Sequence, residues 1–436
     1  NLIFRVAVVH ILLCVIEYKI MNNISRLKQD MEDLGRIGKD PRGGISRPSM
    51  SDPDLDAREF IMEKMREAGL EVYYDLAGNI IGIRRGQCNE FVTTGSHIDT
   101  VLNGGMFDGS LGVLGGIEAI RLMNEEGVET KRSLAIIVFT DEEGNAFAPF
   151  VGSKYFSGTL DKEELVKMRG KYVGVEFSQV FRKFESRVSS KAKKMERFPF
   201  RIKYHVELHV EQGPTLEMNN KDIGIVTGIV GILRLWLRFK GKQSHSGTTP
   251  MNMRKDPMIP ASRMVLDVRE KVKRFEEMVG TTAFMEVKPN VVNVIPGEVY
   301  IGIDVRSMEI EEILNMKEIL INDAKKFSEE EGNLLDHEIL IEEPIRSSSD
   351  VMEKIRGSTE ELGYSYMELP SRAVHDTQMM AKITKVGMIF VPSKSGISHA
   401  PEEWTDWDKA YKGVEVLKET LIKLAKEDLD NYKIQG

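Results

Sequence analysis

The segment Ser133–Thr140, which reads SLAIIVFT, does more than any other to restrict how this chain can fold. Six consecutive apolar residues without polar alternation are typical of a strand buried on both faces, as in a parallel sheet. Helices are predicted at Asp54–Gly69 and Leu111–Glu126, and shorter strands at Glu71–Tyr74, Ile80–Arg84 and Phe91–Thr94. Strands that alternate with helices predict an α/β domain with a mixed, largely parallel sheet.

Composition excludes several classes of protein. The 436 residues are enough for two or three domains, and 41% hydrophobic with 29% charged residues is typical of a folded, soluble chain rather than a disordered one. The formal net charge of -8 gives no overall positive field for nucleic acid. For the Lys- and Arg-rich stretch Gln179–Lys203 we favour a solvated helical face over a polyanion site.

The two cysteines indicate a reducing compartment. Cys14 and Cys88 cannot build a disulfide framework, and they form no Cys-x-x-Cys motif. We therefore expect a cytoplasmic protein. The apolar run Val6–Ile16 has 11 residues, which is too short to span a bilayer, and no membrane association is expected.

Residues 1–20 are set apart from the rest of the chain. The sequence opens NLIFRVAVVH without an initiating Met, and no small-residue cleavage site follows the apolar run. We favour the interpretation that this segment is upstream sequence and that the natural start is Met21. A signal or anchor segment, and a native additional strand or helix, are the alternatives.

A second pattern begins near Ile229. Strands and helices are predicted there in the order β-α-β-β-α-β, at Leu233–Lys240, Met258–Val279, Val291–Val294, Val299–Val305, Ile310–Glu331 and Glu338–Glu342. That order is typical of an α+β ferredoxin-like unit. The α/β pattern resumes with helices at Asp350–Leu362 and Lys409–Glu427 and a strand at Met388–Val391. We therefore predict a domain of residues 229–342 inserted into a larger one formed by 21–228 and 343–436.

The first group of residues with metal-binding chemistry lies in GSHIDT and GGMFDG. His97 follows an apolar strand, and Asp99 is placed to accept the second imidazole N–H and orient the ring. Asp108 lies in a glycine-rich loop, and its two oxygens suit a bridge between two metal ions. Taken alone, this His-x-Asp pattern is more often a surface histidine than a ligand pair.

Three further motifs hold acids and histidines at strand ends. Asp141, Glu142 and Glu143 directly follow the buried strand, where α/β sheets place their sites, although a helix N-terminus explains acids there equally well. Alternation places Glu207, His209 and Glu211 on one face, and His399 lies in a polar loop after the last strand. His97, His209, His245, His375 and His399 share such settings, whereas His10, His205 and His337 do not and are interpreted as structural.

The motifs together resemble those of a known family. GSHIDTVLNGGMFDG, TDEEGNAF, VELHVEQGP, SHSGTTPMNMRKDP, PNVVNVIPGE and SGISHAPEEW are similar, in order, to motifs of the dinuclear-metal M20 peptidase-like family. VELHVEQGP with GTTPM is typical of its branch of N-carbamoyl-L-amino-acid amidohydrolases, β-ureidopropionases and allantoate amidohydrolases. The resemblance extends from Arg26 to Leu424. It implies a zinc-peptidase-like catalytic domain with an inserted lid and dimerisation domain.

The resemblance assigns a role to each candidate residue. Two divalent metal ions per subunit are implied, zinc first, with manganese, cobalt or nickel as alternatives, held by His97, Asp108, Glu143, His209 and His399. Asp108 would bridge the ions, Asp99 would support His97, and Glu142 would be the general base. Residues expected to contact substrate or stabilise the oxyanion are Gln212, His245, Asn293, Arg306 and His375. His245 is expected from a lid, often that of the partner subunit, which implies a homodimer. We predict that the two subunits pair edge to edge through the strand Leu233–Lys240.

The implied reaction is hydrolysis of the ureido C–N bond of an N-carbamoyl-L-amino acid, giving the amino acid, carbon dioxide and ammonia. Allantoate or a related ureido acid is the nearest alternative, a dipeptide is a further one, and a metal-binding protein with weak activity is the alternative from another class. Arg306 suits the carboxylate of either ureido acid, because a guanidinium binds both oxygens at once. Without the resemblance, a salt bridge inside the smaller domain is an equally good interpretation of Arg306. One departure from the family is Arg372 and Val374, which replace two glycines before His375. If either position needs a positive φ, that loop must rearrange.

Overall fold

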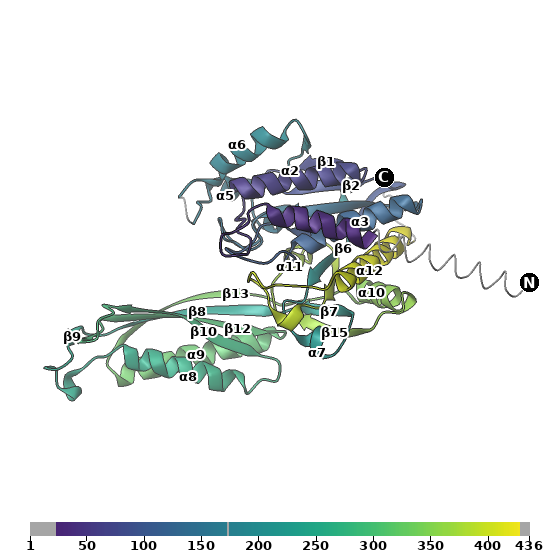
Figure 1. Ribbon diagram of the computed structural model, residues 1–436. Helices are drawn as coiled ribbons and strands as arrows, with labels where there is room; N and C mark the ends of the chain where they lie inside the picture. The colour runs from purple at the N-terminus through teal and green to yellow at the C-terminus, as the bar shows by residue number, and fades with distance from the viewer. Residues whose placement is uncertain (1–22, 172–173, 428–436) are drawn as a thin grey trace, which may run out of the picture. The chain divides into compact units, whose positions relative to one another are not determined.

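The computed structural model describes residues 23–171 and 174–427, and the segment 1–20 considered above lies outside the described residues. The chain divides into two compact units (Figure 1). The larger unit contains the described residues up to Thr227, together with Ser347–Leu369 and the chain from His375 onward. The smaller unit contains Gly228–Arg346 and Pro370–Val374.

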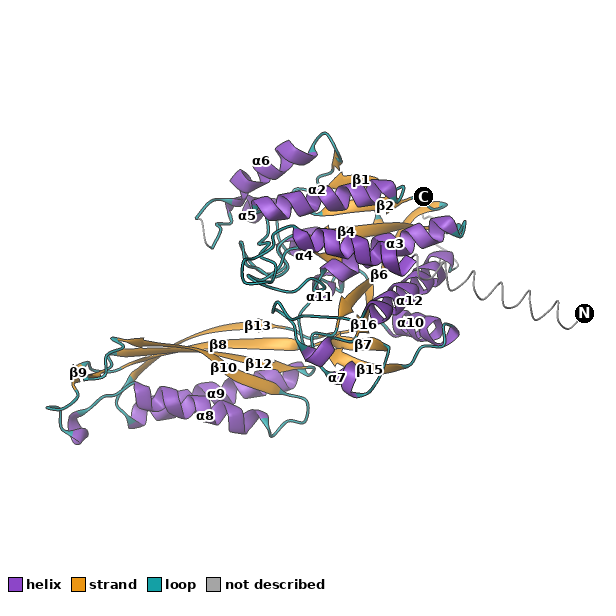
Figure 2. Cartoon of the chain, viewed as in Figure 1, coloured by secondary structure: helices purple, strands orange, loops and turns teal. Residues whose placement is uncertain are grey.

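The larger unit is built on a mixed sheet whose central strands are parallel (Figure 2). Its strand order is β7-β16-β6-β3-β4-β2-β1-β5, and β15 also pairs with β7. The strands are β1 (Glu71–Tyr74), β2 (Ile80–Arg84), β3 (Cys88–His97), β4 (Arg132–Phe139), β5 (Lys193–Lys194), β6 (Arg201–Val210), β7 (Ile223–Ile229), β15 (Tyr366–Ser371) and β16 (Lys385–Val391). Strands β16, β6, β3 and β4 run parallel to one another. The predicted α/β architecture with a largely parallel sheet is therefore confirmed.

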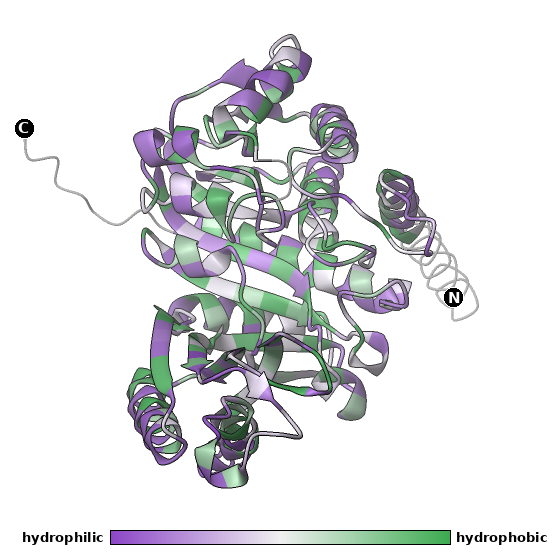
Figure 3. Cartoon of the chain, turned by 90° about the vertical axis from the view of Figure 1, so that its left-hand side faces the viewer, coloured by the Kyte–Doolittle hydropathy of each residue, from purple (hydrophilic) through white to green (hydrophobic). Residues whose placement is uncertain are grey.

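The parallel register places the candidate site. Because parallel strands end at the same edge of a sheet, the residues that follow β3, β4, β6 and β16 come together there. His97 is the last residue of β3, and it pairs with Phe139, the last residue of β4. Every residue of β4 is buried, as its apolar sequence predicts. Apolar residues also run along the central strands in Figure 3.

Helices cover both faces of this sheet. They are residues 23–36, α2 (Asp52–Glu67), α3 (Ser110–Glu125), α4 (Val151–Phe156), α5 (Lys162–Lys167), α6 (Phe177–Val188), α7 (Thr215–Met218), α10 (Ser349–Glu361), α11 (Thr377–Met380) and α12 (Trp407–Lys426). The start of α2 follows from its sequence, because the Ser51 side chain accepts the Asp54 N–H and Pro53 lies in the first turn. Helix α3 is buried along almost its whole length against β3 and β6.

The basic stretch between residues 179 and 203 is a solvated surface in the described structure. Phe177, Phe184 and Val188 of α6 are buried, while Lys183 and Arg187 point outward and pair with acids of α2. Because these cations already have carboxylate partners, the structure favours the solvated helical face over a polyanion site.

The smaller unit has the predicted β-α-β-β-α-β order. Its main elements are β8 (Gly231–Lys240), α8 (Met258–Val272), β10 (Val279–Lys288), β12 (Glu298–Ser307), α9 (Ile310–Glu330) and β13 (Leu334–Glu342), and its minor ones are β9 (Ser244–His245), β11 (Val294–Ile295), β14 (Ile345–Arg346) and the short 3-10 turn Met251–Met253. The four antiparallel strands have the order β10-β12-β8-β13. Both long helices pack on one face of this sheet, over a core that includes Leu235, Leu237 and Ile301.

Two element predictions in this unit were wrong. Helix α8 ends at Val272, and Val279 begins β10, so the predicted helix Met258–Val279 was seven residues too long. The residues between them are good helix formers such as Lys and Glu, which give no stop signal in the sequence. The predicted strand Val291–Val294 is a loop as far as residue 293, and only β11 pairs there, with β9.

The unit boundaries differ from the predicted ones by one residue at the start and four at the end, since the smaller unit spans Gly228–Arg346 where 229–342 was expected. The short segment Pro370–Val374 also belongs to the smaller unit, which the sequence did not indicate. No helix within residues 23–171 and 174–427 has the length and apolarity that crossing a membrane requires.

Candidate active site

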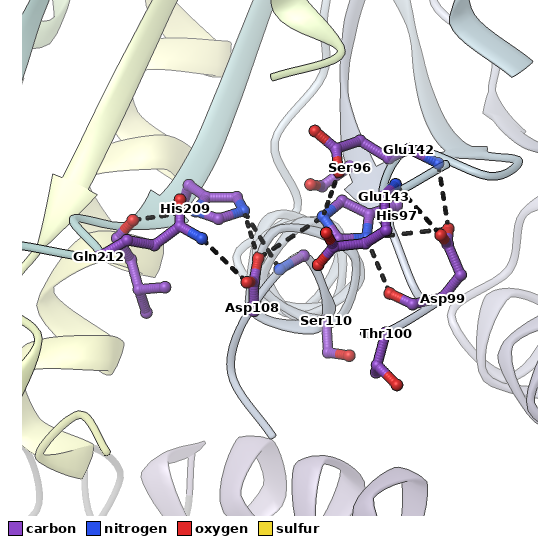
Figure 4. A network of polar contacts seen from close by, with 12 residues as sticks. Ser96, His97, Asp99, Thr100, Asp108, Ser110, Glu142, Glu143, His209 and Gln212 are labelled. Atoms are coloured by element: carbon purple, nitrogen blue, oxygen red, sulfur yellow. Dashed lines mark hydrogen bonds and ion pairs between the residues drawn. The ribbon is translucent and has the colours of Figure 1, made fainter. Parts of the chain in front are cut away.

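Two histidines and an aspartate converge at the carboxyl edge of the larger unit's sheet (Figure 4). The Nε2 atoms of His97 and His209 lie 3.6 Å and 3.2 Å from Oδ1 of Asp108. All three residues are buried. His97 ends β3, His209 lies near the end of β6, and Asp108 precedes α3, so three separate elements deliver the side chains. Their ligand atoms are close enough together to hold one metal ion.

A second group of donors lies on the other side of Asp108. Oδ2 of Asp108 is 3.0 Å from Nε2 of His399, and that nitrogen is 3.4 Å from Oε1 of Glu143. Asp108, Glu143 and His399 also meet the spacing that a single metal ion needs. The two groups share Asp108, so one carboxylate presents an oxygen to each.

The imidazole rings are held in the tautomer that a metal ligand needs. Nδ1 of His97 lies 3.0 Å from the backbone oxygen of Asp99, and Nδ1 of His209 lies 2.9 Å from that of Val210. Because a carbonyl oxygen only accepts, each Nδ1 donates, and in the neutral ring Nε2 keeps its lone pair. The donor set therefore fits divalent metal ions in both chemistry and orientation.

Asp99 is buried beside His97, but its carboxylate has other partners than the predicted one. Its carboxylate lies 3.8 Å from Nδ1 of His97, too far for a hydrogen bond, and the ring is held instead by the Asp99 backbone. The carboxylate accepts the N–H groups of Glu142 and Glu143, each at 3.3 Å. Asp99 therefore fixes the loop that carries the two glutamates.

Glu142 and Glu143 are hard to ionise without a cation. Burial raises the pKa of Glu142 well above its usual value, and the neighbouring Glu143 raises it further against the attraction of His97. Burial, with Asp108 nearby, raises the pKa of Glu143 to about 7. Burial also opposes ionisation of Asp108, but hydrogen bonds from His209, His399 and His97 hold its pKa well below the usual range. Such a set of buried acids is stabilised by bound positive charge.

The histidines respond to the same charges. Burial alone would lower the pKa of His97, but the carboxylates of Glu142 and Asp108 raise it well above the usual value. The hydrogen bond to Asp108 raises the pKa of His399 to about 9, and Glu143 adds to the effect. Divalent cations would replace these protons, because a ligating imidazole is neutral.

Glu142 is placed beside the donors rather than among them. Its Oε2 lies 3.7 Å from Nε2 of His97, and the residue is buried. It belongs to none of the donor groups that meet metal-binding spacing within the described residues. A carboxylate next to a metal centre, but outside its ligand set, is suited to accept a proton from a reacting water.

A glycine allows the backbone before α3 to lie close to the ring of His97. Gly109 has a φ of +63°, and a Cβ there would fall 2.5 Å from the ring of His97. Any larger residue would both strain the backbone and displace a ligand. The glycine-rich loop before α3 is therefore required by the ligands that flank it.

Gln212 and His375 lie in the same region. Nε2 of Gln212 donates to Oδ2 of Asp108 at 2.9 Å and lies 3.3 Å from Nε2 of His399. His375 is buried, with its ring centroid 4.6 Å from that of His209. Burial lowers the pKa of His375 well below its usual value, with His209 adding to the effect. The neutral ring of His375 can therefore still accept a hydrogen bond.

The other three predicted residues belong to the smaller unit. His245 is exposed in β9, and its Nδ1 accepts the N–H groups of Gly247 and Thr248. Asn293 is exposed, and its backbone oxygen accepts the N–H of Ser246. Arg306 donates through Nε to Asp304 at 2.8 Å and through Nη1 to the backbone oxygen of Arg372 at 2.8 Å. The structure thus brings His245 and Asn293 close, because β9 pairs with β11 and Asn293 directly precedes β11.

The substituted loop before His375 is built without strain. Neither Arg372 nor Val374 has a positive φ, so the bulky side chains do not force a rearrangement there. Arg372 is anchored instead, through hydrogen bonds from its guanidinium to the backbone oxygen and a carboxylate oxygen of Glu277.

One buried carboxylate at the site was missed by the sequence argument. Glu403 accepts hydrogen bonds from the backbone of Phe107 and Asp108. Its position within the quoted SGISHAPEEW motif was the available signal, but two adjacent glutamates there could not be told apart by pattern. Only the structure shows that Glu402 is exposed and Glu403 buried.

Comparison with known proteins agrees with this geometry. Residues 93–423 match the model of peptidase family M20/M25/M40. The chain is 38% identical over 409 residues to an N-carbamoyl-L-amino acid amidohydrolase of Geobacillus stearothermophilus, covering 92% of this chain and 98% of that protein. It is 32% identical over 403 residues to an allantoate amidohydrolase of Bacillus subtilis, covering 91% and 96%.

A solved structure shows the same fold. An amidase of the hydantoinase/carbamoylase family from Burkholderia multivorans superposes with a TM-score of 0.85 at 31% identity, covering 93% of this chain and 98% of that one. Because neither unit is small enough to lie outside a match that covers 93% of the chain, the match extends over both units. The chain therefore belongs to peptidase family M20/M25/M40, within its hydantoinase/carbamoylase branch, and is an amidohydrolase.

Proposed function

We propose that the protein binds two divalent metal ions and hydrolyses the ureido C–N bond of an N-carbamoyl-L-amino acid. The observation that carries the proposal is the shared carboxylate: His97 and His209 face one oxygen of Asp108, and His399, with Glu143 beside it, faces the other. Imidazole and carboxylate donors fit zinc best, and manganese, cobalt and nickel are also suited.

Glu142 is the proposed general base. The bound ions supply Lewis acidity, which lowers the pKa of a coordinated water and polarises the ureido carbonyl. Glu142 accepts a proton from the attacking water and passes it to the leaving nitrogen as the C–N bond breaks. The products are the free amino acid and a carbamate, which decomposes to carbon dioxide and ammonia. The position of Glu142 supports this role, since its carboxylate lies beside His97 but outside both donor groups.

The remaining residues recognise the substrate. Arg306 binds the carboxylate, because Asp304 and the Arg372 carbonyl hold its guanidinium in place while Nη1 and Nη2 each retain an N–H. Gln212 and His375, beside the donors, contact the ureido group. His245 stabilises the oxyanion, and Asn293, which lies beside it, contributes to substrate binding.

A second candidate substrate is allantoate, which is also a ureido acid with a carboxylate. The Bacillus subtilis relative named for that activity favours it, although its 32% identity is lower than the 38% of the carbamoylase. Arg306 suits both substrates equally.

A substrate panel tests the proposal. Protein reconstituted with Zn²⁺ or Mn²⁺ is expected to release ammonia from N-carbamoyl-L-amino acids faster than from allantoate, and to leave dipeptides intact. Faster turnover of allantoate would reverse the order of the two candidates. Turnover of dipeptides alone would refute both.

Metal content provides a separate test. Elemental analysis of the reconstituted protein is expected to give about two equivalents per chain, because two donor groups share one carboxylate. A content that stays at about one with every metal tried would refute the two-ion centre.

We also propose a homodimer that forms through the smaller unit. The predicted contact, edge-to-edge pairing through Leu233–Lys240, was wrong: this strand, β8, is interior and pairs on both sides, with β12 and β13. The free edges of that sheet are β10 and β13. We favour β10, because this strand exposes Phe284 and Met285 and contacts α8, which exposes Ile259 and Leu266.

A further inference from the structure

Glu403 is a buried carboxylate to which the reaction described above gives no part. The residue is only 4% exposed. Oε1 accepts the N–H of Phe107 at 2.8 Å and the N–H of Asp108 at 3.0 Å. Oε2 accepts the hydroxyl of Ser398 at 2.9 Å. Both oxygens are therefore engaged, and each points to a residue of a ligand loop.

These contacts join two loops that lie far apart in the sequence. Asp108 lies in the loop before α3, and Ser398 directly precedes His399 in the loop after β16. The Ser398 oxygen lies 3.3 Å from Nε2 of Gln212, which donates to it, and 3.4 Å from Oδ2 of Asp108. The Glu403 carboxylate thus holds the backbone of Asp108, the shared ligand, and the side chain of Ser398, which precedes the ligand His399.

The space around Glu403 is built to hold it. A Cβ at Gly105 would fall 2.3 Å from the Glu403 carboxyl group, so only glycine fits there. The next residue, Trp404, packs its ring against Phe107, with centroids 5.5 Å apart. Apolar packing and hydrogen bonds thus hold the same two segments together, and the carboxylate cannot turn away without leaving two buried N–H groups unpaired.

We propose that Glu403 is a positioning residue for the metal centre, one that sets the direction of Asp108 toward both donor groups. Asp108 must present Oδ1 to His97 and His209 and Oδ2 to His399, which is possible only for a narrow range of backbone orientations. Hydrogen bonds to a ligand's surroundings commonly alter metal affinity by about 10- to 100-fold. The inference rests on the proposed function only in that the centre binds metal.

The test compares three variants with wild-type protein by Co²⁺ binding. Glu403→Ala is expected to weaken Co²⁺ affinity by about tenfold or more and to change the visible absorption of the bound ion, because the orientation of Asp108 is lost. Glu403→Gln keeps an oxygen for the two backbone N–H groups and is expected to recover most of that loss. Glu402→Gln removes the same charge at the exposed neighbouring position and is expected to bind Co²⁺ as wild type does.

Affinity is measured by competition with a chelator, and thermal unfolding is followed on the metal-free proteins. If Glu403→Ala lowers the melting temperature but keeps wild-type Co²⁺ affinity and absorption, Glu403 is only structural and the proposal fails. Equal losses in the Gln and Ala variants would also overturn it, since charge rather than orientation would then be responsible.

A further variant keeps the proposal testable if Glu403→Ala does not fold. Ser398→Ala removes the contact to Oε2 of Glu403, together with the longer contacts of this hydroxyl to Gln212 and Asp108, and is expected to weaken Co²⁺ affinity by about tenfold. If the Ser398→Ala variant and the Glu403→Gln variant both bind Co²⁺ with wild-type affinity, the proposal is refuted. No assay here depends on turnover, so a wild-type protein that binds Co²⁺ but hydrolyses no ureido acid would refute the proposed function alone.

Discussion

At the scale of single residues, Glu142 and Glu143 are adjacent in the chain but face different chemistry. Both backbone N–H groups are held by Asp99, and the two residues lie at the same edge of the sheet, Glu142 buried and Glu143 half-buried. Only Glu143 lies in a donor group with Asp108 and His399. Two adjacent residues therefore have different proposed roles: Glu142 transfers protons and Glu143 binds metal.

This separation predicts opposite results for two matched variants. Glu142→Gln is expected to lower kcat by at least about a hundredfold, because an amide cannot take up the proton, while metal content is retained. Glu143→Gln is expected to lower metal content, because a ligand oxygen loses its charge. Elemental analysis and steady-state kinetics on both variants measure the two effects. Near-normal kcat in Glu142→Gln would show that another group is the base.

The donor residues were predicted because their motifs, taken in order, resemble those of a known family. His97, Asp108, Glu143, His209 and His399 lie together in the structure. The sequence pattern could not predict contacts that are made through backbone atoms. The Asp99 carbonyl, rather than its carboxylate, holds His97, and Glu403 was indistinguishable from its neighbour.

At the scale of secondary structure, the predictions were correct for elements that are buried on one face or completely. They were wrong where the helix propensity of the residues, or a lack of apolar alternation, pointed to another structure. Strand β4 and helix α9 lie within one residue of their predicted ranges. The end of α8 was missed, since Lys273 to Met278 contains no glycine or proline to stop a helix. Strand β10 is an edge strand with many exposed residues, so its sequence has little apolar alternation.

Strand β6 carries a buried histidine that makes stability depend on pH. His205 lies beside Phe139, its Nδ1 is 2.9 Å from Oγ1 of Thr93, and burial lowers its pKa to about 3. In the unfolded chain the ring takes up a proton near pH 6.5, so the unfolded state binds more protons than the folded state below that pH. Folding stability is therefore lost as pH falls from about 6.5 toward 3, by about 1.4 kcal/mol per pH unit.

His205→Gln is expected to remove this contribution. Between pH 7 and pH 5, metal-free wild-type protein should lose about 2 kcal/mol more unfolding free energy than the variant. Denaturant unfolding at both pH values measures the difference. His337→Gln, at an exposed position on β13, is the control and should leave the wild-type slope unchanged. The same slope in His205→Gln would show that His205 is protonated in the folded state.

At the scale of the whole molecule, the proposed dimer predicts which surface variants break it. Met285→Lys on β10 and Leu266→Lys on α8 are expected to convert the dimer to monomer, because each places a charge in an apolar contact. Leu334→Lys, on the opposite edge strand β13, is the matched control, since Leu334 is also exposed. Sedimentation velocity gives the mass of each. Dissociation by Leu334→Lys alone would place the interface on β13.

A mixing experiment tests whether His245 acts across that interface. His245→Ala and Glu142→Gln are each expected to be inactive, because one lacks the oxyanion donor and the other the base. If His245 acts on the partner's site, a mixed dimer contains one complete site, and activity should return as subunits exchange. Absence of recovery despite exchange, followed with labelled subunits, would place His245 in its own subunit's site or outside catalysis.

The insertion of the smaller unit into the larger one has a consequence for how such an enzyme evolves. The larger unit's chain leaves at Thr227 and resumes at Ser347, and the N–H of Ser347 donates to the oxygen of Thr227. Because the two ends emerge side by side, residues 230–344, which lie between β7 and β14, can change in length and sequence without altering the register of the sheet. All proposed metal ligands lie outside that range, whereas His245, Asn293 and Arg306 lie within it. Selection can therefore change which acid is recognised while the hydrolytic centre stays intact.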